Sequence, residues 1–67
     1  MQKISMKAAR VAAGLTQQEM ADKLGVTRST VNLWENGKLN MKKANFIAFC
    51  AVAGFEEDDI FLPVNIT

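Results

Sequence analysis

The sequence contains no histidine and no tyrosine, and its single cysteine, Cys50, lies within an apolar run. One cysteine cannot form an internal disulfide. Without histidine, the chain also lacks a set of zinc ligands and an imidazole that could act as a catalytic base. Free cysteines are usually buried, and Cys50 is expected to pack inside the protein rather than to react. These absences argue against most enzymes. We expect no catalytic residue, metal ion, cofactor or small-molecule ligand.

Long hydrophobic runs are also absent. No stretch approaches the roughly 18 consecutive apolar residues of a membrane-spanning helix, and residues 1–6 lack the apolar centre of a signal peptide. We therefore expect a protein of the cytoplasm without a membrane partner. The chain has 67 residues, of which 49% are hydrophobic, with four glycines and one proline. This composition predicts a folded chain, with a single domain over residues 1–67.

The charges are unevenly distributed along the chain. All eight lysine and arginine residues lie within residues 1–43, which carry a net charge of +5, whereas residues 44–67 contain four acids and no base, for a net charge of −4. Such asymmetry suggests that the first part faces a polyanion. On charge alone, however, an ordinary solvated surface is the better explanation. A motif is needed to decide between them.

Three short helices are predicted in the first part of the chain. The first begins after Ser5, an N-cap residue, and ends at Gly14. The spacing of Thr16 and Glu19 is that of a capping box, so the second helix begins at about residue 17 and ends at residue 25. The third begins after Thr27 and covers about residues 28–36. The apolar residues of these segments are expected to face the core, and they are Met6, Ala9, Ala13, Met20, Ala21, Leu24, Val26, Val31 and Trp34.

Two more helices are predicted in the second part. Asn40 is a suitable N-cap for a fourth helix, which ends at Gly54. The acids at residues 56–59 favour the N-terminus of a short fifth helix, because carboxylates oppose the positive end of the helix dipole. Leu62 and Pro63 end it. The side chains expected to face inward are those of Phe46, Phe49, Cys50, Ala53, Ile60 and Phe61.

The second and third helices, joined by a tight glycine-containing turn, have the form of a helix-turn-helix. Arg10, GLTQQEMA (residues 14–21), LGVTRSTV (24–31) and WENG (34–37) follow one another with a spacing that resembles the phage repressor and Cro family of regulators. The resemblance covers about residues 6–61 and leaves a tail, residues 62–67. It implies an all-α, compact five-helix domain of the lambda-repressor type.

The resemblance also implies that the chain binds a specific sequence of double-stranded DNA, with the third helix in the major groove. The exposed positions near the start of this helix are then candidates for reading bases. Arg28 can donate two parallel hydrogen bonds to guanine, Ser29 and Asn32 can exchange hydrogen bonds with base edges, and Leu33 can pack on a thymine methyl. The alternative is that Arg28 is an ordinary solvated charge at the end of a helix and does not contact a base. Leu33 can instead belong to the core or to a partner contact.

Contacts to the DNA backbone are implied at a second set of positions. Gln17 stands at the start of the second helix, where free amides and the helix dipole attract a phosphate, and the matching family position holds a phosphate-binding glutamine. Ordinary solvation is the alternative. Lysines just past the third helix supply charge without sequence information. The full set of backbone candidates is Gln17, Gln18, Thr27, Asn36, Lys38, Lys42 and Lys43.

Arg10 and Glu35 are predicted to have a structural role. In the family, the matching residues form a largely buried ion pair between the first and third helices, which would orient the third helix. The alternative is an exposed pair, which contributes under about 1 kcal/mol to stability.

One recognition helix reads few base pairs, and sites of this family are commonly two-fold palindromes, so a homodimer is expected. Leu62, Val64 and Ile66 alternate in the tail, which either supplies a strand-like contact or frays. We expect a regulator that occupies an operator. Two alternatives stay open. One is a DNA-binding antitoxin with a toxin protein as its partner, and the other is a protein-interaction module that uses Leu33 and Trp34.

Overall fold

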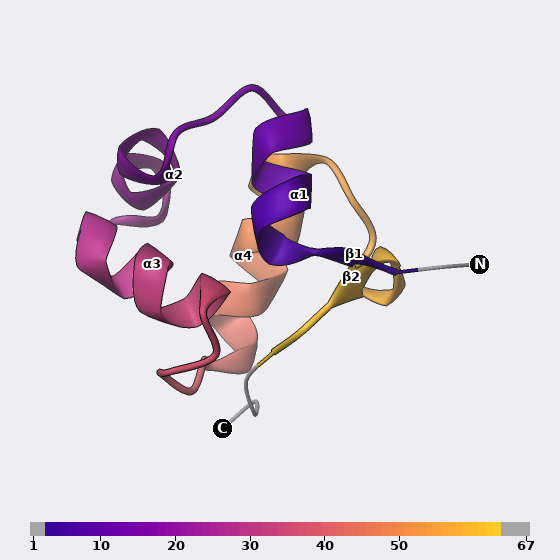
Figure 1. The fold of residues 1–67 in the computed structure, drawn as a ribbon. Helices are drawn as coiled ribbons and strands as arrows, with labels where there is room; N and C mark the ends of the chain where they lie inside the picture. The colour runs from indigo at the N-terminus through magenta and orange to yellow at the C-terminus, as the bar shows by residue number, and fades with distance from the viewer. Residues whose placement is uncertain (1–2, 64–67) are drawn as a thin grey trace.

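The computed structural model describes residues 3–63, and in this range the chain forms four α-helices, one short 3-10 helix and two short strands. The elements in chain order are β1 (Ile4–Ser5), α1 (Met6–Ala12), α2 (Gln17–Leu24), α3 (Arg28–Glu35), α4 (Lys43–Ala53), η1 (Glu57–Asp59) and β2 (Ile60–Phe61). In Figure 1, α2 and α3 lie on one side of α1 and α4, and the strand pair lies on the other.

The starts of α1, α2 and α3 are set by the predicted N-caps. At α2, the Thr16 hydroxyl accepts from the backbone N–H of Glu19 at 3.0 Å, and the Glu19 carboxylate accepts from the backbone N–H of Thr16 at 2.9 Å. Hydrogen bonds from the backbone N–H and the side chain of Thr16 to the Glu19 carboxylate lower its pKa, so the carboxylate is ionised and can accept in the capping box at neutral pH. Ser5 and Thr27 each accept from the backbone N–H three residues further on. Local sequence therefore fixes where these three helices begin, and the left-handed Gly25, with a φ of +71°, ends α2 before the turn to α3.

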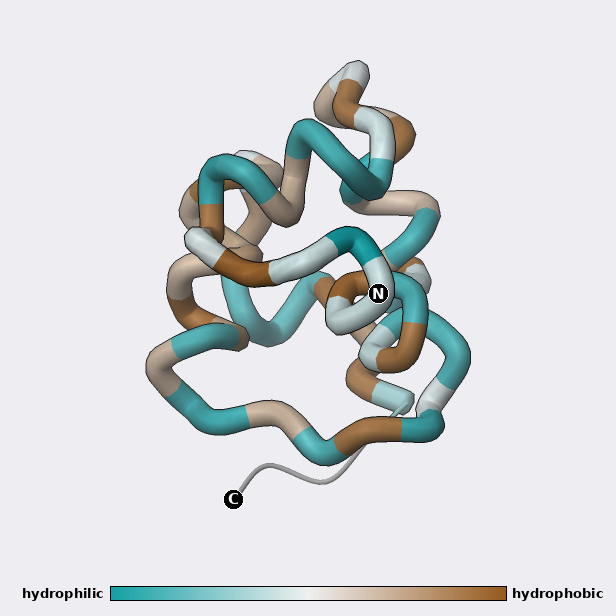
Figure 2. The backbone as a smooth tube through the Cα atoms, turned by 90° about the vertical axis from the view of Figure 1, so that its left-hand side faces the viewer, coloured by the Kyte–Doolittle hydropathy of each residue, from teal (hydrophilic) through white to brown (hydrophobic). Residues whose placement is uncertain are grey.

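The core draws side chains from all four α-helices. α3 packs against α2, and α4 packs against α2 and α1. Burial raises the pKa of the Cys50 thiol, which therefore stays protonated. Figure 2, drawn from the side that carries α2 and α3, shows hydrophilic residues alternating with short hydrophobic stretches, as expected of amphipathic helices around one core. The buried apolar residues are Met6, Ala9, Met20, Ala21, Val31, Trp34, Met41, Phe46, Phe49, Cys50, Ala53 and Ile60.

The prediction of five helices is wrong in the C-terminal part. In place of a fifth helix the chain forms one turn, η1, and then the strand β2, which pairs in parallel with β1 through Ile4 opposite Ile60 and Ser5 opposite Phe61. Successive residues of a strand point to opposite sides. Ile60 takes the buried side at 2% exposure, so Phe61 is 58% exposed and does not turn inward as predicted.

Two helix ends also differ from the prediction. Asn40 does not cap α4, whose N-cap is Lys42, without a side-chain hydrogen bond. The reason is Met41, which is fully buried, because bringing this side chain into the core delays the start of the helix. Ala13 is the exposed C-cap of α1 rather than an inward-facing residue of that helix.

Gly37, just past α3, packs against the C-terminal segment. Its φ is +72°, and a Cβ at this position would lie 2.9 Å from the carbonyl oxygen of Pro63, whereas Gly14, with a φ of +76°, has open space around it. A side chain in this backbone conformation costs about 1 to 2 kcal/mol. Both Gly37→Ala and Gly14→Ala are expected to destabilise the protein, and Gly37→Ala more, since it adds a steric clash. Denaturant unfolding measures both, and equal losses would contradict the close packing of Pro63.

Candidate nucleic-acid interface

The start of α3 presents four side chains on one exposed face. Arg28, Ser29, Asn32 and Leu33 lie at helical positions i, i+1, i+4 and i+5, and all four are exposed. Val31 and Trp34, on the other face, are 0% and 3% exposed and belong to the core. The four residues predicted from the sequence to read bases therefore share one side of α3.

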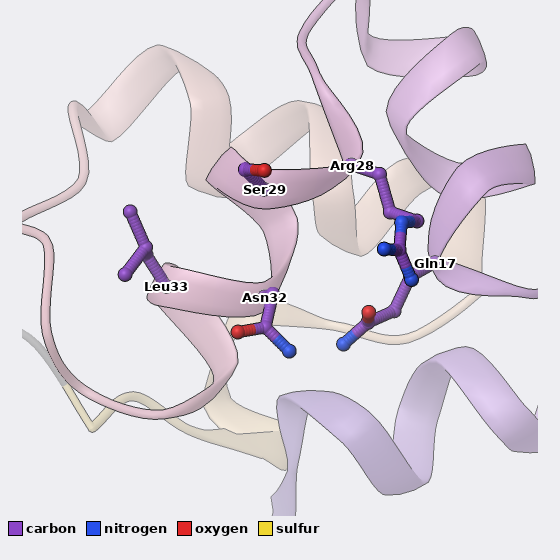
Figure 3. Close-up of a pocket in the computed structure, with 5 residues that line it drawn as sticks. All are labelled: Gln17, Arg28, Ser29, Asn32 and Leu33. Carbon is purple, nitrogen blue, oxygen red and sulfur yellow. The ribbon is translucent and has the colours of Figure 1, made fainter.

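These four side chains and Gln17 line one hollow in the surface, shown in Figure 3. Gln17 is the first residue of α2, and the other four side chains come from the first to the sixth position of α3, so the hollow extends from the N-terminal end of α2 along α3. In Figure 3 the Arg28 side chain extends toward Gln17, and Asn32 points into the same space. Leu33 is 37% exposed, which excludes the alternative that it is a core residue.

Arg10 and Glu35 join α1 to α3 through a buried ion pair. The Arg10 Nε donates to Glu35 Oε2 at 2.7 Å, and its Nη2 donates to Oε1 at 3.2 Å. The two side chains are 7% and 3% exposed, so this is not the exposed pair of the alternative. Arg10 Nη1 also donates to the carbonyl oxygen of Leu15 at 2.8 Å. The pair therefore ties α3 both to α1 and to the loop before α2.

Gln17 connects this ion pair to the hollow. Its Nε2 donates to Glu35 Oε1 at 3.1 Å, so one carboxylate holds both Arg10 and Gln17. Because Nε2 donates to Glu35, this hydrogen bond sets the orientation of the Gln17 amide group. The second hydrogen on Nε2 and the amide oxygen remain available to other partners. Sequence reasoning identified Gln17 as a candidate for a phosphate contact. It missed the link to Glu35, because no spacing rule reports a side-chain contact between residues 18 positions apart.

Three other polar candidates make local hydrogen bonds. The Gln18 side chain donates to Asp22 at 2.8 Å, and the Thr27 hydroxyl caps α3. The Asn36 side chain donates to both the backbone oxygen and the side-chain oxygen of Asn32, at 2.9 and 3.2 Å. Since the Asn32 oxygen is engaged, its NH₂ group is left to donate elsewhere.

The lysines past α3 differ in their surroundings. Lys38 and Lys42 are exposed and form no ion pair among residues 3–63. The Lys43 ammonium, in contrast, lies 2.9 Å from a carboxylate oxygen of Glu57 in η1. Lys38 and Lys42 therefore offer positive charge with no acidic partner among the described residues, whereas the charge of Lys43 is partly offset by the exposed Glu57 carboxylate. In the tail, Leu62 packs against the core, whereas Val64 and Ile66 lie outside the described residues.

A family model described as helix-turn-helix matches residues 6–60, from the start of α1 to the first residue of β2. The match includes every candidate for a base or backbone contact and the Arg10–Glu35 pair. No curated protein and no solved structure matches the chain. Between residues 3 and 63, no helix is long and apolar enough to cross a membrane, and no group of three or more side chains is placed to hold a metal ion.

Proposed function

The chain belongs to the helix-turn-helix family of repressor and Cro-type DNA-binding regulators, and we propose that it acts by occupying a specific operator sequence in duplex DNA. The observation that carries this proposal is the shared exposure of Arg28, Ser29, Asn32 and Leu33 around one hollow of α3. An α-helix about 10 to 12 Å across fits the major groove, which is about 12 Å wide.

The side chains of the hollow differ in what they can read. The Arg28 guanidinium can donate two hydrogen bonds to O6 and N7 of a guanine, and the Asn32 NH₂ group and the Ser29 hydroxyl can bond to base edges. Leu33 provides an apolar surface that suits the methyl group of a thymine. The four residues together suit a short sequence that contains both a G·C and an A·T pair.

Backbone contacts flank this reading surface on both sides. Gln17 and the free backbone amides at the start of α2 can bind one DNA phosphate. Lys38 and Lys42 can bind phosphates of the DNA strand that runs past the end of α3. We further propose that two copies bind together, because a single helix reads too few base pairs to define an operator. Two-fold related copies would then read half-sites about 34 Å apart on a palindrome.

Salt dependence tests whether DNA is the partner. Affinity for duplex DNA is expected to fall steeply between about 50 and 200 mM salt, because phosphate contacts release counterions. Lys38→Ala and Lys42→Ala should each reduce the slope of log K against log salt by about 1. Fluorescence anisotropy with a labelled duplex measures this slope.

Lys43→Ala provides the matched control in the same segment. Its ammonium is paired with Glu57, so its effect on the slope should be smaller than that of Lys42→Ala. Glu57→Gln should release Lys43 and increase the affinity. A slope near zero for the unmodified protein would contradict DNA binding and favour a protein-interaction module on the same fold.

A further inference from the structure

Asn36, the residue that ends α3, holds the side chain of Asn32 one helical turn before it. The Asn36 Nδ2 donates to the backbone oxygen of Asn32 at 2.9 Å and to its side-chain Oδ1 at 3.2 Å. Both side chains are exposed. The two hydrogens of the Asn36 NH₂ group are thus matched by two acceptors on Asn32, and its own side-chain oxygen is left over.

The remaining groups of Asn36 do not suit a direct contact with a DNA phosphate. Phosphate oxygens accept hydrogen bonds, so such a contact needs a free donor on the protein. The side-chain oxygen of Asn36 cannot donate, and its backbone N–H donates to the backbone oxygens of Asn32 and Trp34. In this arrangement Asn36 acts on DNA through Asn32.

The same hydrogen bonds set the orientation of the Asn32 amide group. Its Oδ1 is directed toward Asn36, which is not among the residues that line the hollow. In Figure 3 the Asn32 nitrogen lies on the side of Gln17, and the oxygen lies on the side away from it. Asn32 therefore offers the hollow an NH₂ group with two hydrogens to donate.

We propose that Asn36 is a positioning residue that makes Asn32 select a base with an exocyclic oxygen, guanine or thymine. The inference rests on the proposed function, in which α3 lies in the major groove, and it adds which bases one side chain selects. In the major groove, guanine O6 and N7 and thymine O4 are acceptors, whereas cytosine N4 and adenine N6 donate. The NH₂ group of Asn32 bonds to the first three atoms and meets another donor at the last two.

Without Asn36, adenine would be the base that suits Asn32 best. An asparagine reads adenine through two hydrogen bonds, in which its oxygen accepts from N6 and its nitrogen donates to N7. This contact needs both ends of the amide to face the base, and Asn36 directs the oxygen elsewhere. The other residues of the hollow agree with this assignment, because Arg28 also only donates and none of the five lining residues is acidic.

Competition binding to the half-site selected from a random DNA pool tests the inference. Asn32→Ala identifies the base pair that Asn32 reads, as the one position at which preference is lost. The test duplex has adenine in place of the guanine or thymine of that pair. Asn36→Ala should raise the affinity for this duplex, relative to the selected site, by about tenfold, because the freed amide can turn its oxygen to the base. Preference at the position read by Arg28 should not change.

Asn36→Asp provides a second variant of similar shape. Its carboxylate cannot donate to Asn32, so the same shift toward adenine is expected, together with weaker binding to every duplex from the added negative charge. Asn36 has a φ of −93°, which alanine and aspartate also adopt, so both variants should fold, as circular dichroism can verify.

The matched control is Asn36→Ala in a chain that already carries Asn32→Ala. Since Asn36 acts through Asn32, the second change should then alter neither preference nor affinity. Further weakening on every duplex would identify a phosphate contact and overturn the inference, as would an unchanged preference in Asn36→Ala alone. An unmodified chain that shows no sequence preference would overturn the proposed function itself, so the two failures are distinguishable.

Discussion

Arg10→Met is expected to lower the free energy of unfolding by about 3 to 5 kcal/mol, because it leaves the Glu35 carboxylate buried without its cationic partner. The Gln17 amide would be the one remaining side-chain donor to this carboxylate among the described residues. Small domains are stable by only about 5 to 15 kcal/mol, so a loss of this size removes much of the total. In a domain of this length, each 1 kcal/mol shifts the melting temperature by about 4 to 8 °C.

Thermal unfolding followed by circular dichroism measures the effect, and two variants serve as controls. Lys43→Met breaks an exposed ion pair and should cost under about 1 kcal/mol. Adding Glu35→Gln to Arg10→Met should recover part of the loss, since no buried charge then remains. The contradicting result would be a melting temperature of Arg10→Met that differs from the unmodified chain by no more than that of Lys43→Met does. The buried pair would then not hold α3 in place.

Arg28→Ala is expected to relax sequence preference at one base pair of each half-site by about 1 to 3 kcal/mol of discrimination, since a bidentate contact to guanine would be lost. Arg28 is exposed and makes no hydrogen bond or ion pair within the described residues, so the fold should be unchanged. Competition binding between the selected site and variants of it, changed at one base pair at a time, measures the preference.

Lys38→Ala is the matched comparison for Arg28→Ala. A phosphate contact carries no sequence information, so its loss should weaken binding to every duplex alike. If Arg28→Ala also weakened binding uniformly, with no position relaxed, Arg28 would be a backbone contact and the assignment of the reading surface would be wrong.

Features that depend on neighbouring residues were predictable from the sequence. The N-caps Ser5, Thr16 and Thr27 were identified correctly, because capping requires only a side-chain oxygen and the backbone N–H of a residue three positions on. Since these caps fix where α2 and α3 begin, the sequence also predicted which side chains of α3 are exposed.

Features that depend on distant contacts were not predictable in the same way. The strand β2 forms because β1, more than 50 residues earlier, lies beside it, and no local pattern distinguishes this segment from a short helix. The burial of Met41, the hydrogen bond from Gln17 to Glu35 and the ion pair between Lys43 and Glu57 are of the same kind.

Selection of bound sequences from a random pool of duplex DNA tests the central claim most directly. Reading by Arg28, Ser29, Asn32 and Leu33 predicts one enriched consensus, arranged as a two-fold palindrome with half-site centres about 34 Å apart. A pool that remains unenriched after repeated rounds, at every ionic strength from low to physiological salt, would contradict the account.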